Sequence, residues 1–366
     1  LSQFSRHYGV DRRSRTLTIV DRPADTRSWT VPTGVPCRKC GAPTTECCRN
    51  CHYPFPARWR QSETLSIAFA GPRFTGKTIS IACLVHALGQ FAEAKGWPLT
   101  HATALSRRTY EKRYQEPLFE TREVLPPTPR GNTANAPQLE PLILTLGSRA
   151  GRPLNLVLRD AAGEDLEEEA DLEHLAFFGR ADLVVFLFDP TQVQEVKDLV
   201  KDVMPVNNLP GKPLQVLEHL LRLARGGSPR LAVTVAKLDA LWEVGKGSLA
   251  ADEQGSRTAF LQLSRAMANP GSALRSDLLW TAEGAEIDDD LQRVHHEVRS
   301  LLTLLHATQL VHTVEQSAIG HAGRSAYFAS SALGHPPNSQ GTSPHGIAPY
   351  RVIDPILWLL RAERLL

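Results

Sequence analysis

The stretch at residues 64–78 constrains the fold of this chain more than any other. An apolar run, residues 64–70, leads directly into Gly71-Pro-Arg-Phe-Thr-Gly76-Lys77-Thr78. This spacing is typical of a phosphate-binding loop, in which backbone N–H groups surround a phosphate, a lysine reaches its oxygens and a hydroxyl holds Mg²⁺. Residues 77–95 carry apolar side chains at helical spacing, so we expect a helix whose amino terminus faces the phosphates. The predicted nucleotide-binding residues of this loop are Gly71, Pro72, Arg73, Phe74, Thr75, Gly76, Lys77 and Thr78.

Two further apolar runs, residues 142–146 and 154–158, predict a β-hairpin. The second run ends in Asp160, and Gly163 follows. Ligands of open α/β sheets gather at the carboxyl ends of the strands. We therefore expect Asp160 to bind Mg²⁺ together with Thr78, and Gly163 to offer its N–H to a terminal phosphate.

The remaining strands are expected from near-continuous apolar runs at residues 181–190, 230–235 and 325–330. Helical patterns separate them. The fold class is therefore α/β, a P-loop NTPase sheet flanked by helices, occupying residues 64–366 with a helical insertion at about 240–322. Residues 98–118 are expected to be polar helix.

Residues 125–137 are rich in Pro, Gly and Asn, which predicts a mobile loop without regular structure. Thr128 and Thr133 are the hydroxyl-bearing residues within it.

Two Cys-x-x-Cys pairs in residues 37–51 have the spacing of a zinc ribbon. Four thiolates make a closed tetrahedral shell with no position for water, so the metal is expected to be structural. Cys47 could take the place of Cys48 as a ligand, and His52 could take the place of Cys51. Alternatively, the cysteines bind no metal and are redox-active or form disulfides. We expect a flexible arm at residues 1–36 and a ribbon at 37–60. The predicted ligands are Cys37, Cys40, Cys48 and Cys51.

Composition adds little to these motifs. The chain has 366 residues, a formal net charge of +2 and no apolar run of membrane-spanning length. Nothing in the charge favours nucleic acid or a membrane as partner, although a nucleic-acid-binding ribbon stays open. No secretory leader is evident and the cysteines are clustered, so we expect a soluble protein of the reducing cytoplasm.

Taken in order, these motifs resemble the five signature elements of a Ras-like GTPase of the translation-factor-related class. The resemblance implies that Asp239 binds guanine N1 and N2, that Lys237 packs over the base, and that the backbone of Ser331 and Ala332 meets guanine O6. It also implies a switch threonine in the mobile loop, for which we take Thr133, with Thr128 as the alternative.

A closer resemblance is to the bacterial double-GTPase family. It is carried by the cysteine ribbon, Cys-His-x-Pro, the phosphate loop, a long helical region, Ser-Ala-Leu-Gly and a Pro-Ile-Leu-Trp-Leu-Leu ending. Zinc-ribbon members of that family are encoded beside partner GTPases in predicted defence loci. The resemblance implies a protein partner, either a second GTPase or an effector, and a defence role.

Three positions depart from the GTPase pattern. Ala236 replaces the usual Asn or Thr, which removes a contact between the base loop and the phosphate loop. Glu164 stands where many small GTPases place Gln, and a carboxylate accepts from water but cannot donate to a phosphate. Arg73 replaces a glycine, and would obstruct the γ-phosphate, act as an internal arginine finger, or point to solvent.

We therefore expect a Mg²⁺-dependent GTP-binding switch with slow hydrolysis. Alternatives are an ATPase, a nucleotide-binding scaffold without turnover, and a zinc-ribbon nucleic-acid adaptor with a regulatory GTPase. The predicted catalytic residues are Arg73, Lys77, Glu164 and Thr133.

Overall fold

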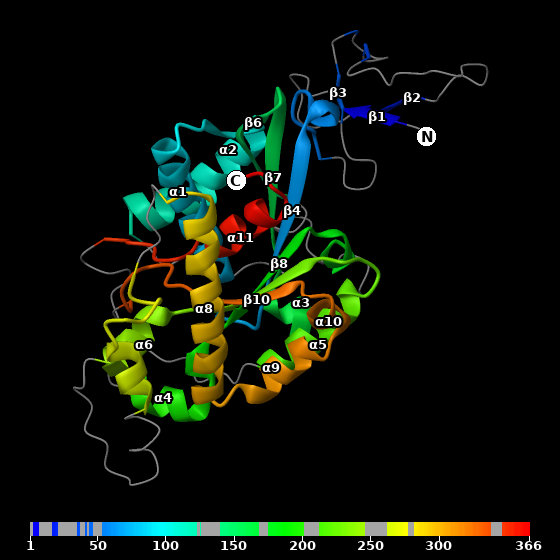
Figure 1. The fold of residues 1–366 in the computed structure, drawn as a ribbon. Helices are drawn as coiled ribbons and strands as arrows, with labels where there is room; N and C mark the ends of the chain where they lie inside the picture. The colour runs from blue at the N-terminus through cyan, green and yellow to red at the C-terminus, as the bar shows by residue number, and fades with distance from the viewer. Residues whose placement is uncertain are drawn as a thin grey trace.

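A seven-stranded sheet flanked by helices forms the body of the computed structural model (Figure 1). The order of its strands is β10-β9-β8-β4-β7-β6-β5. The structure describes residues 3–6, 17–20, 35–36, 41, 44–46, 53–122, 125, 140–167, 175–200, 212–245, 262–276, 282–337 and 346–366.

Most of the sheet is parallel, and only β6 runs in the opposite direction, since it pairs antiparallel with both of its neighbours, β7 and β5. The carboxyl ends of the parallel strands therefore meet at one edge, where the loops carrying the predicted site begin. Every residue of β8 is buried, as expected for a strand covered by helices on both faces. The strands are β4 (Glu63–Ala70), β5 (Leu99–His101), β6 (Leu142–Arg149), β7 (Arg152–Asp160), β8 (Leu183–Phe188), β9 (Arg230–Val235) and β10 (Ser325–Ala329).

The hairpin of β6 and β7 is as predicted, with Leu142 opposite Leu158. Ala150 and Gly151 both have positive φ, which lets the chain reverse in two residues. Strand β5 was not expected, because residues 98–118 carry a polar helical pattern. It is three residues long and pairs only with β6, so it leaves too short an apolar signal to be detected.

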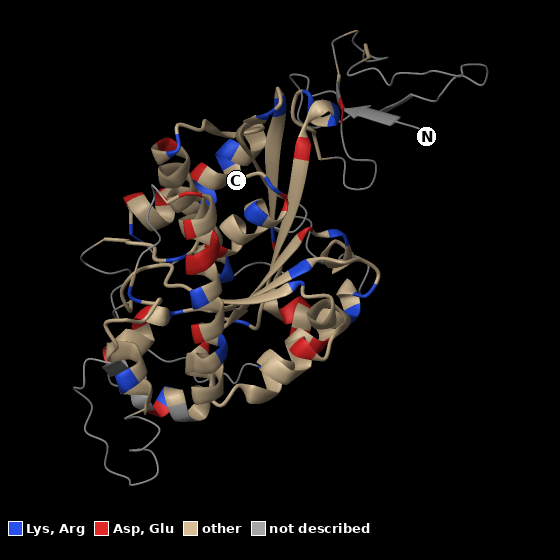
Figure 2. Ribbon diagram, viewed as in Figure 1, with Lys and Arg blue, Asp and Glu red and all other residues tan. Residues whose placement is uncertain are grey.

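Helices fill the connections. In the view of Figure 1, α1, α6 and α8 lie to the left of the strands, and α3, α5 and α10 lie to the right. Charges of both signs are spread over these helices in the same view (Figure 2). The helices are α1 (Lys77–Ala94), α2 (Ala104–Tyr110), α3 (Gly163–Glu167), α4 (Gln194–Val200), α5 (Pro213–Ala224), α6 (Leu238–Gly245), α8 (Gly284–Leu304), α9 (Thr308–Glu315), α10 (Ala318–His321) and α11 (Asp354–Ala362), with a π-helix η2 (Glu111–Glu120) and short 3₁₀ turns η1 (Trp59–Gln61), η5 (Phe178–Arg180) and η6 (Pro190–Gln192).

Between β9 and β10 the described residues are mainly helical, from α6 through a helix at 262–268 to α10. A buried cation attaches this region to α11. The guanidinium of Arg351 is fully buried and donates to Asp290 at 2.9 Å and to Asp354 at 2.6 Å. Burial alone would lower the pKa of Arg351, but the two carboxylates outweigh it and hold the pKa above its usual value.

Three short strands near the amino terminus form a separate sheet in the order β2-β1-β3. They are β1 (Gln3–Arg6), β2 (Leu17–Val20) and β3 (Thr45–Glu46). Two stretches of the expected flexible arm are therefore strands paired with each other and with the predicted ribbon. The predicted zinc ligands lie outside the described residues, so the zinc ribbon stays a prediction.

Among the described residues, no helix combines the length and apolar character needed to cross a membrane.

Candidate functional site

The phosphate loop lies between β4 and α1, as predicted. Gly71 has a φ of 146°, and a Cβ there would lie 2.6 Å from the carbonyl oxygen of Leu187, so only glycine fits. Phe74 has a φ of 62°, an uncommon conformation for a bulky residue, and its side chain is 46% exposed. The loop is thus a strained backbone turn fixed against the neighbouring strand β8.

Lys77 lies beneath this turn at the start of α1. Its Nζ donates to the carbonyl oxygens of Gly71 at 2.9 Å and Pro72 at 2.7 Å. Burial lowers the pKa of Lys77 to about 8, against the opposing effect of carboxylates that include Asp160 and Glu164. The ammonium group is thus desolvated and oriented before any phosphate arrives.

Thr78 and Asp160 form the pair expected to hold Mg²⁺. Thr78 Oγ1 donates to Asp160 Oδ2 at 2.8 Å, and Asp160 is buried at the end of β7. A hydroxyl and a carboxylate at this separation fit a small hard cation that keeps most of its water ligands. These two residues would therefore hold the ion and bring its charge beside the phosphates.

Gly163 begins α3 in direct contact with the phosphate loop. A Cβ on Gly163 would lie 2.6 Å from the backbone nitrogen of Arg73 and 2.8 Å from the carbonyl carbon of Pro72. Because backbone cannot yield as a flexible side chain would, any other residue would push α3 away. The expected role of Gly163 beside a terminal phosphate is compatible with this position.

The side chain of Arg73 turns toward α3. Its Nε lies 3.3 Å from Glu164 Oε1 and 3.1 Å from Glu167 Oε2, and its backbone N–H donates to Glu167 Oε1 at 3.0 Å. The suggestion that Arg73 points to solvent was therefore wrong. Glu167 is correspondingly shielded from solvent, and its side chain is 15% exposed.

A cavity of about 200 Å³ adjoins the loop where a base is expected. Asp239 at its wall is buried and accepts a 2.6 Å hydrogen bond from Ser331 Oγ. Burial raises the pKa of Asp239, an effect only partly offset by that hydrogen bond. The residues around the cavity include Phe74, Thr75, Gly76, Ala236, Lys237, Asp239, Ser330 and Ala332.

Lys237 adopts a left-handed conformation with a φ of 54°, and its Nζ pairs with Asp189 Oδ2 at 2.6 Å. Asp189 also accepts from the backbone N–H and hydroxyl of Thr191. The ion pair fixes the lysine stem beside the cavity. Sequence reasoning missed Asp189, although its position directly after a buried strand was a usable signal.

Two other supporting residues were also missed. Gln192 Nε2 donates to the carbonyl oxygen of Arg73 at 2.9 Å, and Tyr350 exchanges two backbone hydrogen bonds with Ser331. Neither belongs to a recognisable motif, because each contact joins segments distant in sequence.

The structure therefore gathers the loop 71–78, Asp160, Gly163 and Glu164 at one edge of the sheet, with Lys237, Asp239, Ser331 and Ala332 beside them. Thr128 and Thr133 lie outside the described residues, so the switch threonine stays a prediction. Within the described part of the chain, no group of three or more His, Cys, Asp or Glu residues could hold a metal ion.

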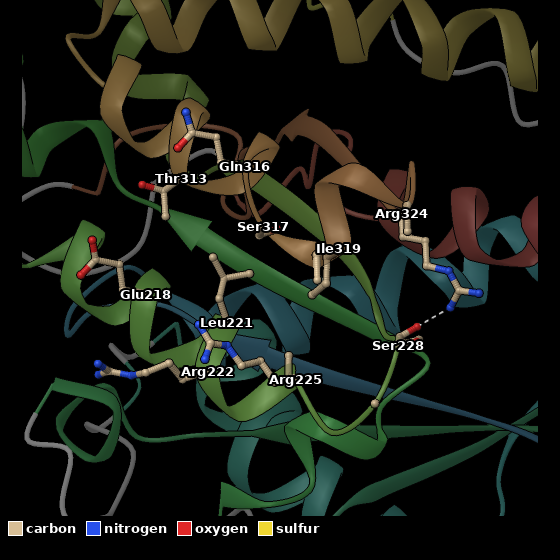
Figure 3. A pocket seen from close by; sticks show the side chains of 14 residues that line it. Glu218, Leu221, Arg222, Arg225, Ser228, Thr313, Gln316, Ser317, Ile319 and Arg324 are labelled. Atoms are coloured by element: carbon tan, nitrogen blue, oxygen red, sulfur yellow. Dashed lines mark hydrogen bonds between the residues drawn. The ribbon is translucent and has the colours of Figure 1, made fainter.

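A larger cavity, about 550 Å³, lies between α5 and the α9–α10 pair (Figure 3). Arg324 lines it at one side and donates to the carbonyl oxygen of Ser228. Ser228 precedes β9 and Arg324 precedes β10, so this cavity is at the amino ends of two strands whose carboxyl ends lead to Asp239 and Ser331. It is therefore separate from the nucleotide site.

Comparison with known proteins agrees with this geometry. A family model described as Double-GTPase 2 matches residues 65–309. A protein of Mycolicibacterium smegmatis (strain ATCC 700084 / mc(2)155), "Putative ESX-1 scaffolding and assembly protein SaeC", is 38% identical over 331 residues, which cover 90% of this chain and 82% of that protein.

Similar solved structures include a bacterial selenocysteine-specific elongation factor, with a TM-score of 0.24, 13% identity and coverage of 55% of this chain and 22% of that one. The GTP-bound GTPase-like domain of S. cerevisiae Ski7 gives a TM-score of 0.31 and 10% identity, with coverage of 75% and 44%. The chain spans less than half the length of either structure.

Proposed function

Because this chain belongs to the Double-GTPase 2 family, we propose that it binds GTP with Mg²⁺, hydrolyses it slowly and acts as a nucleotide-dependent switch. One observation carries the proposal: a buried carboxylate, Asp239, lies on the same small cavity as the phosphate loop. A carboxylate accepts two N–H donors side by side, and guanine presents such a pair where adenine does not.

In this proposal the phosphates lie against the loop. Lys77 supplies positive charge to the β- and γ-phosphate oxygens, and Thr78 with Asp160 holds the Mg²⁺ that bridges them. Asp239 and the backbone of Ala332 select the base, and Lys237 packs over it. Positioning and charge are most of what phosphoryl transfer requires of a protein.

Slow hydrolysis follows from Glu164. A carboxylate beside the terminal phosphate orients water by accepting a hydrogen bond from it but cannot donate one to the phosphate, and its charge opposes the charge developing in the transition state. Arg73 is bound to the same carboxylate and to Glu167, so in this state its charge is partly neutralised. Thr133 is the proposed switch threonine, and segments 125–137 and 160–173 are proposed to change order with the γ-phosphate.

A nucleotide-binding scaffold without turnover is the second candidate. The ion pair between Arg73 and Glu164 favours it, because it occupies both groups that hydrolysis would use. The printed name of the Mycolicibacterium relative concerns scaffolding and assembly, which supports protein partners for this chain. Defence remains a prediction from the family resemblance, as do the zinc ribbon at 37–60, a partner GTPase and a cytoplasmic location.

Calorimetry with GTP, GDP and ATP, followed by single-turnover phosphate release, tests both candidates. Tight guanine-nucleotide binding, weak ATP binding and turnover on the order of 10⁻⁴ per second or somewhat above support the switch. Tight binding with no turnover supports the scaffold. Equal affinity for ATP and GTP contradicts the assignment of Asp239, and no binding of either nucleotide contradicts both candidates.

A further inference from the structure

Glu167 is an anion held against the phosphate loop by the loop itself. One carboxylate oxygen accepts the backbone N–H of Arg73 at 3.0 Å, and the other lies 3.1 Å from the Nε of the same residue. One residue of the loop thus binds both oxygens of one carboxylate. The backbone on the carbonyl side of Arg73 is also held, because Gln192 Nε2 donates to the Arg73 carbonyl oxygen at 2.9 Å.

The arrangement of α3 makes this contact specific. Gly163 touches the backbone of the loop so closely that no Cβ fits, which fixes the start of α3. Glu164 and Glu167 are three residues apart on that helix and therefore project from one face, toward Arg73. The contact is a consequence of the fold, and it joins residues 94 positions apart in sequence.

The charged side chains around the loop already carry a net negative charge. Lys77 and Arg73 contribute two positive charges, and Asp160, Glu164 and Glu167 contribute three negative ones. All three carboxylates are near enough to Lys77 to act on its pKa. A γ-phosphate placed beside Gly163, as proposed, would add further negative charge to this cluster, whereas the β-phosphate of GDP would lie one phosphate farther from α3.

From these contacts we infer that Glu167 is a specificity-determining residue, an internal carboxylate that competes with the γ-phosphate for Arg73 and thereby shifts nucleotide preference toward GDP. For GTP to bind, the contact between the Glu167 carboxylate and Arg73 must break, which also separates α3 from the loop. GDP leaves the contact in place. The inference rests on the proposed function, because it presumes that the loop binds guanine nucleotides.

The test measures dissociation constants of GTP and GDP, with Mg²⁺, for the parent protein and Glu167→Gln. The amide keeps the size of the side chain and an acceptor for the Arg73 N–H but removes the charge. A unit charge a few ångströms from a phosphate in a partly buried site changes affinity by roughly tenfold. We expect GTP affinity to rise by about that factor and GDP affinity to change less than about threefold.

Glu218→Gln is the matched control. It removes the same charge from α5, where Glu218 borders the cavity at the amino ends of the strands (Figure 3), and should leave the affinity ratio of GTP to GDP unchanged. Thermal unfolding of each nucleotide-free variant verifies folding. If Glu167→Gln does not fold, Glu167→Met, similar in length and uncharged, carries the same expectation.

An unchanged ratio in a folded Glu167 variant overturns the inference, as does an equal gain for both nucleotides. These failures are distinct from failure of the proposed function, in which the parent protein would bind neither nucleotide. A change in the ratio with Glu218→Gln as large as that with Glu167→Gln would also overturn it, because the effect would then be one of general charge.

Discussion

Titration of Lys77 should control nucleotide affinity in mildly alkaline solution. The free protein holds this lysine with a pKa of about 8, because burial removes the water that would stabilise the ammonium. Bound phosphates restore a favourable environment for the charge, so the pKa rises when nucleotide binds. Binding above pH 8 must therefore take up a proton.

The magnitude follows from the pKa of the free protein. Below pH 7 the lysine is already charged and its protonation state does not limit affinity. At pH 9, one unit above the pKa, about one molecule in ten is charged, so the apparent dissociation constant should rise roughly tenfold, equivalent to about 1.4 kcal/mol. At pH 8, about half a proton should be taken up for each nucleotide bound.

Calorimetry in two buffers with different heats of ionisation measures this uptake directly. The matched variant is Lys77→Arg, whose guanidinium stays charged throughout the range. Ionisation of the nucleotide affects parent and variant alike, so the difference between them isolates Lys77. If Lys77→Arg binds nucleotide, its proton uptake at pH 8, beyond that due to ionisation of the nucleotide itself, should be close to zero.

The free energy of unfolding provides a second measurement with a defined sign. The pKa of Lys77 is lowered from the model-compound value of 10.5, so between about pH 8 and 10.5 the unfolded chain binds more protons than the folded one. The nucleotide-free protein should therefore gain up to about 3 kcal/mol of stability from this group across that interval. Lys77→Met should remove that pH dependence.

Flat nucleotide affinity between pH 7 and 9, with no proton uptake at pH 8, would refute this reasoning. It would mean that the ammonium of the free protein is hydrated, contrary to its burial beneath the Gly71–Pro72 turn.

Four other predictions concern separate parts of the molecule. Asp239→Asn should exchange guanine for xanthine preference in competition binding, because an amide donates where the carboxylate accepts; unchanged preference would place base recognition elsewhere. Zinc analysis should find one ion per chain, absent in Cys40→Ser, whereas a metal-free parent with oxidised thiols would favour disulfides. Arg73→Gly should speed single-turnover hydrolysis and Glu164→Gln should add to it, while slowing by Arg73→Gly would identify an internal finger. Arg351→Met should lower the free energy of unfolding by about 3 to 5 kcal/mol in urea, because it leaves Asp290 and Asp354 buried without their cation.

Much of the site could be predicted because its elements are local. The phosphate loop is one uninterrupted run between a strand and a helix, and Asp160, Asp239 and Ser331 each lie at the carboxyl end of a strand or shortly after it. A buried parallel strand leaves a continuous apolar run in the sequence, so the edge at which these residues meet was also predictable.

The rest depends on contacts between distant segments. Glu167 resembles every other acid in its stretch until α3 is placed against the loop, and Asp189 gains its role only when Lys237 lies opposite. Buried Arg351 has no local pattern at all, since its partners are contributed by α8 and α11. Side-chain partners of this kind are set by packing, which a single sequence does not report.

The bridge between Ser331 and Tyr350 has a consequence for the order of events during synthesis. Tyr350 is followed directly by Arg351, whose partner Asp354 begins α11, so the wall behind Asp239 is held in place by segments made late. The phosphate loop leaves the ribosome far earlier, by on the order of tens of seconds at ordinary elongation rates. A nascent chain would thus hold a phosphate cradle before it could tell one base from another, and it would acquire base discrimination only once the segments around Tyr350 and Asp354 had been made.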